Sequence, residues 1–257
     1  MLPVLLLHSV TRDKTDFEDF APLVSSLARP LKPCPVDHIG HGDAVRADRY
    51  RITDFADGIV LPRTPFALYG HSLGGMVALC IAARHPDLVE AVVLEDPPLF
   101  DSKQPRLDAT HWADGFRKLK SLMAGRGASW GEAEWQRAAV HWPSGHGSKT
   151  ISQAGGPKAA ERRGRQIVKL DPNVLDAMVA DTLHEGFDVI ASLRAACCAV
   201  TILAGDRAAG SALTDEDLRL LAPEPNVTLV HAHGVGHYVR EADPRLCVRA
   251  LEAAVAT

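Results

Sequence analysis

The 257 residues carry 46% hydrophobic side chains and a formal net charge of −4. That length suits one domain with an insertion, and the weak negative charge gives no electrostatic basis for binding nucleic acid or an anionic membrane. No apolar run in the sequence is long enough to cross a bilayer. We therefore expect a small-molecule substrate as the partner, with no nucleic acid and no membrane involved.

The cysteine content bears on the cellular compartment. The five cysteines are odd in number, and three lie in apolar surroundings, which is typical of buried thiols in a reducing compartment. Residues 1–7 are apolar but lack the basic segment of a signal peptide. We expect a cytoplasmic protein, and a homodimer is compatible with this composition.

Strand-like apolar runs alternate with helical periodicity along the chain. Strands are predicted at residues 3–7, 34–39, 66–69 and 91–94, with helices at 17–28, 52–60 and 76–83 between and after them. After an interruption the same order resumes, with strands at 199–203 and 227–230 and helices at 215–221 and 244–255. Such alternation predicts an α/β fold with a mostly parallel sheet and right-handed crossovers.

The interruption spans residues 99–193 and has a different composition. Its apolar residues have helical spacing, and it contains all four tryptophans, which are Trp112, Trp130, Trp135 and Trp142. We predict a helical cap (lid) over 99–193, inserted into a core domain formed by 1–98 and 194–257. Trp142 is a candidate for lining a substrate pocket, although aromatic residues on helices are more often simple core.

The segment that organises the chain is Gly70-His71-Ser72-Leu73-Gly74. It follows a predicted buried strand and precedes an apolar helix, which is the setting of a Gly-x-Ser-x-Gly nucleophile elbow. Ser72 must occupy a strained turn with its hydroxyl projecting, and side chains at Gly70 or Gly74 would collide with the strand and the helix. Ser72 is therefore the candidate nucleophile.

Together these motifs resemble the α/β-hydrolase fold superfamily. His8-Ser9 resembles the family's first-loop His-Gly, residues 40–42 its Gly-His-Gly, residues 70–75 its elbow, and Gly236-His237 its terminal Gly-His. The resemblance implies a parallel sheet flanked by helices with an inserted cap, and a serine hydrolase that needs no cofactor. His8, His41 and His71 are expected to brace the loops and the elbow.

A serine hydroxyl needs a base to take its proton and an acid to fix the tautomer of that base. His237, just past the last predicted strand, is the candidate base. His231-x-His233 near it also suggests zinc, but these two histidines would share one face of a strand with no carboxylate or cysteine to complete a set. We therefore expect no metal.

The orienting acid has three candidates. The commonest family pattern places it three residues beyond Gly205, where this chain has Ala208. Asp96 closes the strand after the elbow, and residues 94–98 and 236–241 resemble N-formylmaleamate deformylase and zearalenone lactonase, which take their acid from that strand end. We assign Asp96, with Asp206 as the alternative acid and Glu95 as the third candidate.

An acyl-transfer intermediate carries an oxyanion, and losing one of its backbone donors costs about 3–4 kcal/mol of barrier. Leu73 N–H is the first expected donor. The second is expected from the first loop, at Val10 or at Ser9, and Ser9 is also a candidate substrate contact. Arg162, Arg163 and Arg165 are expected on a solvated helix face, with a clamp for acidic substrates as the alternative.

We conclude from the sequence that the protein is a cofactor-free serine hydrolase of a small carboxylic ester or lactone. Amide, formyl or carbon–carbon cleavage would use the same residues. Two alternatives stay open: a cofactor-independent dioxygenase or lyase that uses the His237–Asp96 pair without acylating Ser72, and a ligand sensor with slow turnover.

Overall fold

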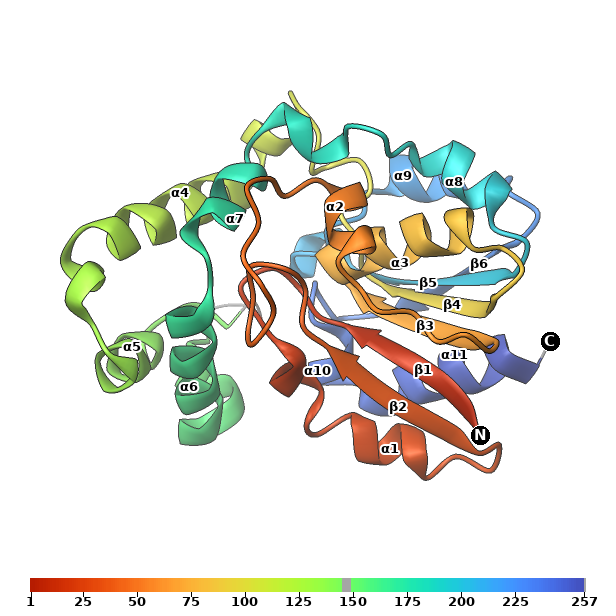
Figure 1. Cartoon of the computed structure of the whole chain (residues 1–257), viewed down its shortest axis with the longest axis horizontal. Helices are drawn as coiled ribbons and strands as arrows, with labels where there is room; N and C mark the ends of the chain where they lie inside the picture. Colours follow the sequence, from red (N-terminus) through yellow and green to blue (C-terminus); the bar gives the residue numbers. More distant parts are fainter. Residues whose placement is uncertain (145–148, 257) are drawn as a thin grey trace.

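The computed structural model describes residues 1–144 and 149–256. Its six strands form one sheet in the order β2-β1-β3-β4-β5-β6, and every neighbouring pair is parallel (Figure 1). The strands are β1 Leu2–Leu7, β2 Leu31–Val36, β3 Phe66–His71, β4 Val89–Glu95, β5 Ala199–Gly205 and β6 Val227–Ala232. The predicted α/β fold with a parallel sheet is confirmed.

Helices connect the strands. The α-helices outside the β4–β5 connection are α1 Ala21–Ser25, α2 Ile52–Asp57, α3 Leu73–Arg84, α9 Asp215–Leu221, α10 Val239–Ala242 and α11 Pro244–Ala256. Those between β4 and β5 are α4 His111–Ala124, α5 Glu132–Ala139, α6 Ile151–Lys169, α7 Pro172–Ala177 and α8 Val189–Ala195. Short 3-10 helices are η1 Lys14–Phe17, η2 Leu107–Ala109, η3 Arg126–Ser129, η4 Asp181–His184 and η5 Arg207–Ala209.

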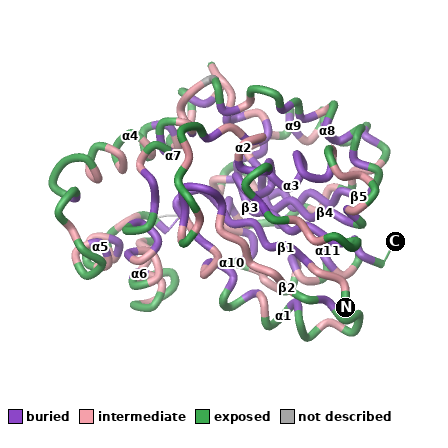
Figure 2. The backbone as a smooth tube through the Cα atoms, in the orientation of Figure 1, coloured by how far each residue is buried: buried purple, intermediate pink, exposed green. Residues whose placement is uncertain are grey.

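The sheet is covered by helices on both faces. Leu5, Leu68 and Val92 point into one core with α2, α3, α8 and α9, whereas the alternate residues of the same strands point into a second core with α1 and α11. The central strands are thus buried on both sides, which is why they read as continuous apolar runs (Figure 2).

Two predicted elements differ from the structure. The helix expected over 17–28 is wrong as one element: η1 ends at Phe17 and α1 begins only at Ala21, because Pro22 lacks the N–H of a helix interior and is accommodated in a first turn. Strand β2 begins at Leu31, three residues before the predicted start. Its prolines, Pro33 and Pro35, are tolerated because β2 is an edge strand.

The β4–β5 connection is helical. Helices α4–α7 lie beyond the carboxyl ends of β1 and β3, and much of their surface is exposed (Figures 1 and 2). Helix α8 packs on α3 beside the sheet, so the boundary predicted at residue 193 falls inside a helix of the core layer. That the segment acts as a cap stays a prediction.

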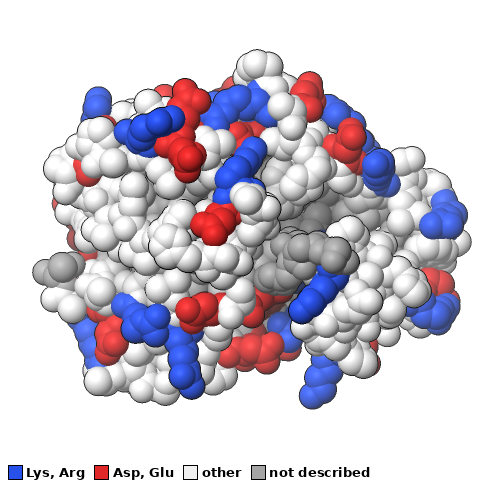
Figure 3. Space-filling view, turned by 180° about the vertical axis from the view of Figure 1, so that it is seen from behind, with Lys and Arg blue, Asp and Glu red and all other residues white. Residues whose placement is uncertain are grey.

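Two surface properties accompany this architecture. Within residues 1–144 and 149–256, no helix is long and apolar enough to cross a membrane. Positive and negative side chains are interspersed on the face shown in Figure 3 rather than gathered into one basic region.

Gly74 allows β1 and α3 to meet. A Cβ on Gly74 would lie 2.1 Å from the carbonyl oxygen of Leu7, and one on Gly70 would lie 2.1 Å from that of Gly74. These neighbours are backbone atoms at the sheet edge and have little room to move. The collisions expected from the elbow sequence are therefore found.

We predict that Gly74→Ala lowers the free energy of unfolding by at least about 3 kcal/mol, at the upper end for overpacking substitutions. The matched control is Gly115→Ala in α4, where an added Cβ meets nothing within 4 Å and should be neutral or stabilising by up to about 1 kcal/mol. Urea unfolding of both variants measures this. Equal stabilities would contradict the predicted clash.

Candidate active site

The carboxyl ends of the central strands bring the predicted catalytic residues to one edge of the sheet. Leu7 pairs with Gly70, His71 pairs with Glu95, and Glu95 pairs with Leu203. Ser72 and Asp96 each follow the last residue of their strand, so they start from neighbouring positions. Ligands of parallel α/β sheets bind at this edge.

Ser72 lies in the sharp turn between β3 and α3. Its backbone has φ 55° and ψ −116°, a strained conformation for a residue with a side chain. The Ser72 N–H donates to Glu95 O at 2.9 Å, which ties the turn to β4. Ser72 is 5% exposed. The elbow is thus assembled as the sequence predicts.

Asp96 is fully buried and surrounded by donors. Its carboxylate accepts hydrogen bonds from Ser211 Oγ at 2.5 Å, from Ala212 N at 2.7 Å and from Gly205 N at 3.3 Å. Burial by itself disfavours the charge, but the hydrogen bonds from His237, Ala212 and Ser211 keep the pKa of Asp96 below its ordinary value. Asp96 is therefore ionised at neutral pH.

The structure brings His237 to Asp96. His237 Nδ1 donates to Asp96 Oδ2 at 2.7 Å, and both side chains are almost completely buried. This bond leaves His237 Nε2 with its lone pair. Within the described chain no hydrogen bond joins Ser72 Oγ to His237; in hydrolases that contact often tightens only when substrate binds.

The other two candidate acids point elsewhere. Asp206 accepts a hydrogen bond from Gly234 N and lies 3.7 Å from His231 Nδ1. Glu95 accepts from Tyr69 Oη at 2.8 Å and from Arg240 N at 2.7 Å, within the second core. Neither carboxylate forms a hydrogen bond with His237.

Of the two predicted oxyanion donors, Leu73 belongs to the elbow and Val10 belongs to the loop after β1. Gly74 abuts the carbonyls of Leu7 and His8, which places the Ser9–Val10 loop beside the start of α3. Within the described residues, neither the Val10 N–H nor the Leu73 N–H donates to a protein acceptor. Ser9 is buried, and its carbonyl accepts from Arg12 N at 3.2 Å to close a turn.

Buried neutral histidines brace this loop. His8 Nδ1 donates to Ser9 O at 2.8 Å, and His8 Nε2 accepts from His38 N at 3.1 Å. Burial, followed by repulsion from His41, lowers the pKa of His8 to about 3, and burial lowers the pKa of His41 to about 4. His71 Nε2 donates to His237 O at 3.0 Å. His41 Nδ1 donates to Ile39 O at 3.0 Å, and its ring lies 5.0 Å from that of His8. These contacts agree with the bracing expected for His8, His41 and His71.

Sequence reasoning missed two residues of this region. The Trp112 ring of α4 lies 4.8 Å from the His237 ring, whereas Trp142, the predicted pocket residue, packs 6.1 Å from the Trp135 ring. The sequence analysis also did not predict Ser211, whose hydroxyl donates a hydrogen bond to the Asp96 carboxylate. No sequence pattern distinguishes Trp112 from the other tryptophans, because all four fall in the same inserted segment.

The three arginines of α6 do not share one solvated face. Arg162 pairs with Asp19 at 2.7 Å, and Arg165 is half-buried. Arg163 donates to Thr11 O and, at 2.5 Å, to Thr11 Oγ1. No described carboxylate lies within ion-pair distance of Arg163, and burial together with repulsion from Arg12 lowers its pKa to about 10. The expected solvated face is therefore wrong for Arg163.

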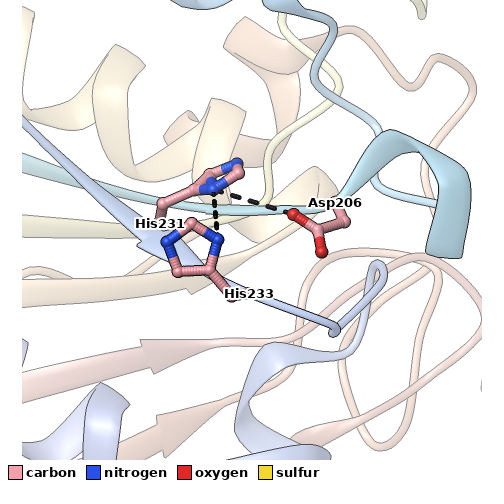
Figure 4. A group of neighbouring side chains, drawn as sticks. All are labelled: Asp206, His231 and His233. Carbon is pink, nitrogen blue, oxygen red and sulfur yellow. Dashed lines mark hydrogen bonds and ion pairs between the residues drawn. The ribbon is translucent and has the colours of Figure 1, made fainter.

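The expectation that no carboxylate completes the set of His231 and His233 is also wrong. Asp206, which follows β5, lies beside the imidazoles of His231 on β6 and of His233 just after β6 (Figure 4). Among the described residues, none of these three side chains forms a hydrogen bond with Ser72, Asp96 or His237, so they form a separate cluster.

The buried histidines predict a pH dependence of stability. His8 and His41 have pKa values well below 6.5 in the folded protein, so the unfolded chain binds more protons between about pH 6.5 and pH 4. Their contribution to stability is present above about pH 6.5 and is lost as the pH falls.

We expect the free energy of unfolding of the native protein to fall by on the order of 3 kcal/mol per buried histidine as the pH is lowered from 6.5 to 4. In His41→Gln the free energy of unfolding should fall less over the same range, because one buried histidine is missing. The titration of carboxylates is common to both proteins and cancels in the comparison. Scanning calorimetry at several pH values measures the difference. Parallel curves for the two proteins would contradict it.

Two curated proteins of known function resemble this chain in sequence. 2-(Acetamidomethylene)succinate hydrolase of Mesorhizobium japonicum is 26% identical over 266 aligned residues, covering 96% of this chain and 86% of that protein. Pimeloyl-acyl-carrier-protein methyl ester esterase of Neisseria meningitidis is 39% identical over 92 residues, and this match spans only 35% of each chain.

Solved structures share the fold. The N-formylmaleamic acid deformylase of Pseudomonas putida superposes with a TM-score of 0.70 at 14% identity, covering 98% of this chain and 91% of that one. The model of the alpha/beta hydrolase family matches residues 4–250. Since that match spans nearly the whole chain, including the elbow and the segment of His237, the protein belongs to the alpha/beta hydrolase family.

Proposed function

We propose that the protein is a serine hydrolase of small carboxylic esters or lactones. The observation that carries the proposal is the buried Asp96–His237 hydrogen bond at the sheet edge where Ser72 occupies a strained elbow. Nucleophile, base and orienting acid thus come from three loops that meet at the carboxyl ends of β3, β4 and β6. Such a constellation serves acyl transfer.

In the proposed reaction Ser72 Oγ attacks the carbonyl carbon of the substrate. His237 Nε2 takes the hydroxyl proton, while ionised Asp96 holds Nδ1–H and stabilises the imidazolium that forms. The negative charge that develops on the carbonyl oxygen is stabilised by the N–H groups of Leu73 and Val10. Each of these donors is worth about 3–4 kcal/mol of barrier.

Collapse of this intermediate breaks the bond to the leaving oxygen, which receives the proton from His237. In an ester the alcohol departs, and in a lactone it stays attached to the acyl group. Water then enters, gives a proton to His237 and attacks the acyl-enzyme, and Ser72 recovers its proton. Ser72 ends as it began, and no cofactor takes part in these steps.

The names of the relatives support an acyl-transfer reaction. One is a methyl ester esterase, another a hydrolase of an acetamidomethylene succinate, and a structural neighbour is described as degrading N-acyl homoserine lactones. We place ester or lactone cleavage first. The segment 99–193 is proposed to cap the site, since Trp112 of α4 contacts the His237 ring.

Arg163 favours a second candidate, a substrate that bears a free carboxylate next to the scissile acyl group. A half-buried guanidinium without an ion-pair partner is destabilised, and a substrate carboxylate would restore its charge balance. Arg163 contacts Thr11, the residue after the proposed oxyanion donor Val10. Two proteins named above act, by their names, on compounds that carry a free carboxylate, which agrees with this candidate.

The direct test of the serine hydrolase is intact-mass analysis after treatment with a fluorophosphonate. We expect one phosphonyl adduct on the native protein and none on Ser72→Ala, because only an activated serine displaces fluoride. If the native protein is folded but stays unmodified, the result would contradict the proposal and favour the dioxygenase, lyase or sensor alternatives.

The test of the carboxylate candidate compares monomethyl succinate with methyl butanoate as substrates. Arg163→Gln should raise KM for the charged ester about 10- to 100-fold and leave the neutral ester nearly unchanged, since a charge-assisted hydrogen bond is worth about 1.5–3 kcal/mol. Arg162→Gln, which loses contacts with Asp19, Glu18 and the Thr15 carbonyl, is the control. Equal losses on both esters would instead identify Arg163 as a brace of the Thr11 turn.

A further inference from the structure

Three potential metal ligands meet outside the proposed catalytic site. Asp206 follows β5, His231 lies on β6, and His233 follows β6 directly (Figure 4). His231 Nδ1 lies 3.3 Å from His233 Nδ1 and 3.7 Å from Asp206 Oδ1, and one ligand atom from each residue lies within 4.8 Å of the other two.

These separations fit a tetrahedral ion. With metal–nitrogen and metal–oxygen bonds of about 2.0–2.2 Å, neighbouring ligand atoms around a tetrahedral zinc are roughly 3.4 Å apart. The distances from His231 to His233 and to Asp206 bracket that value. Small side-chain rotations that bring His233 and Asp206 closer would complete the three-ligand set.

The sheet fixes where these ligands point. His231 lies on β6 and His233 is the first residue after it, and their ring centroids are only 4.6 Å apart, so both side chains point to the same side of the sheet. Ala204 pairs with His231 in the β5–β6 register, which puts Asp206 beside His233. Asp206 Oδ2 accepts from Gly234 N, and this bond turns Oδ1 toward His231.

We propose that Asp206, His231 and His233 bind one divalent cation of the zinc class. Two imidazole nitrogens and one carboxylate oxygen suit zinc, cobalt, nickel and copper, whereas magnesium and calcium prefer all-oxygen sites. The side chains of His231 and Asp206 are 38% and 33% exposed, so water can reach the ion and fill its remaining positions.

The ion would connect the ends of β5 and β6. Asp206 also holds the loop that follows β6, because its N–H donates to Val235 O at 2.7 Å and its carboxylate accepts from Gly234 N. That loop leads through Gly236 to His237. Binding of the ion therefore restrains the segment that carries the proposed base, and it stabilises the folded chain whether or not the proposed hydrolase activity is correct.

The test is calorimetric titration of tag-free protein with zinc. Because Cys197 is an exposed thiol, all titrations use a Cys197→Ser background. We expect one equivalent bound, and a rise in the unfolding temperature with zinc concentration. His231→Ala and His233→Ala should each weaken binding more than about 100-fold, beyond the loss typical of an outer-shell partner, and Asp206→Asn should weaken it as well.

His141→Ala removes another exposed histidine and serves as the matched control, which should bind zinc like the parent. Circular dichroism checks that each surface variant is folded. Absence of one-equivalent binding by the parent, or undiminished binding by both His231→Ala and His233→Ala, would overturn the proposal.

Discussion

The hydrogen bond from His237 to Asp96 joins residues 141 positions apart in the sequence, and both side chains are almost completely buried from solvent. A buried carboxylate is costly unless donors satisfy it, and Asp96 has Ser211, Ala212 and Gly205 besides His237. The connection after β5 must therefore curl back over the end of β4. This requirement fixes the loop at 206–212, and with it the direction in which Asp206 points.

The surroundings of this bond keep other charges away from it. His8, His38 and His41 are buried as neutral imidazoles beside the loop that carries Val10, and His71 is held against the carbonyl of His237. Glu95 and Arg240 place their opposite charges in the core on the other face of the sheet. His237 is therefore hydrogen-bonded to the carboxylate of Asp96, while the other buried imidazoles at this edge stay neutral, as a proton-transfer pair requires.

Local sequence patterns predicted the strands, the elbow and the glycines that let β1 meet α3, because these depend on side-chain period and on contacts between near neighbours. The choice of Asp96 needed more than a local pattern: it rested on the position of Asp96 at the end of a strand and on the resemblance of residues 94–98 and 236–241 to two hydrolases. The local patterns did not reveal that Asp206 faces His231 and His233, that Arg163 turns toward Thr11, or that Trp112 contacts His237. Those orientations are set by contacts between distant segments, which no short window of sequence contains.

The central claim is that Asp96, and not Asp206, orients His237. The most direct test measures kcat/KM for an ester substrate with Asp96→Asn and Asp206→Asn, each checked for folding by calorimetry. We expect the Asp96 variant to lose about 10⁴-fold, as when the acid of a serine triad becomes an amide, and the Asp206 variant to stay within a few-fold of the native protein. The reverse order of losses would contradict the account.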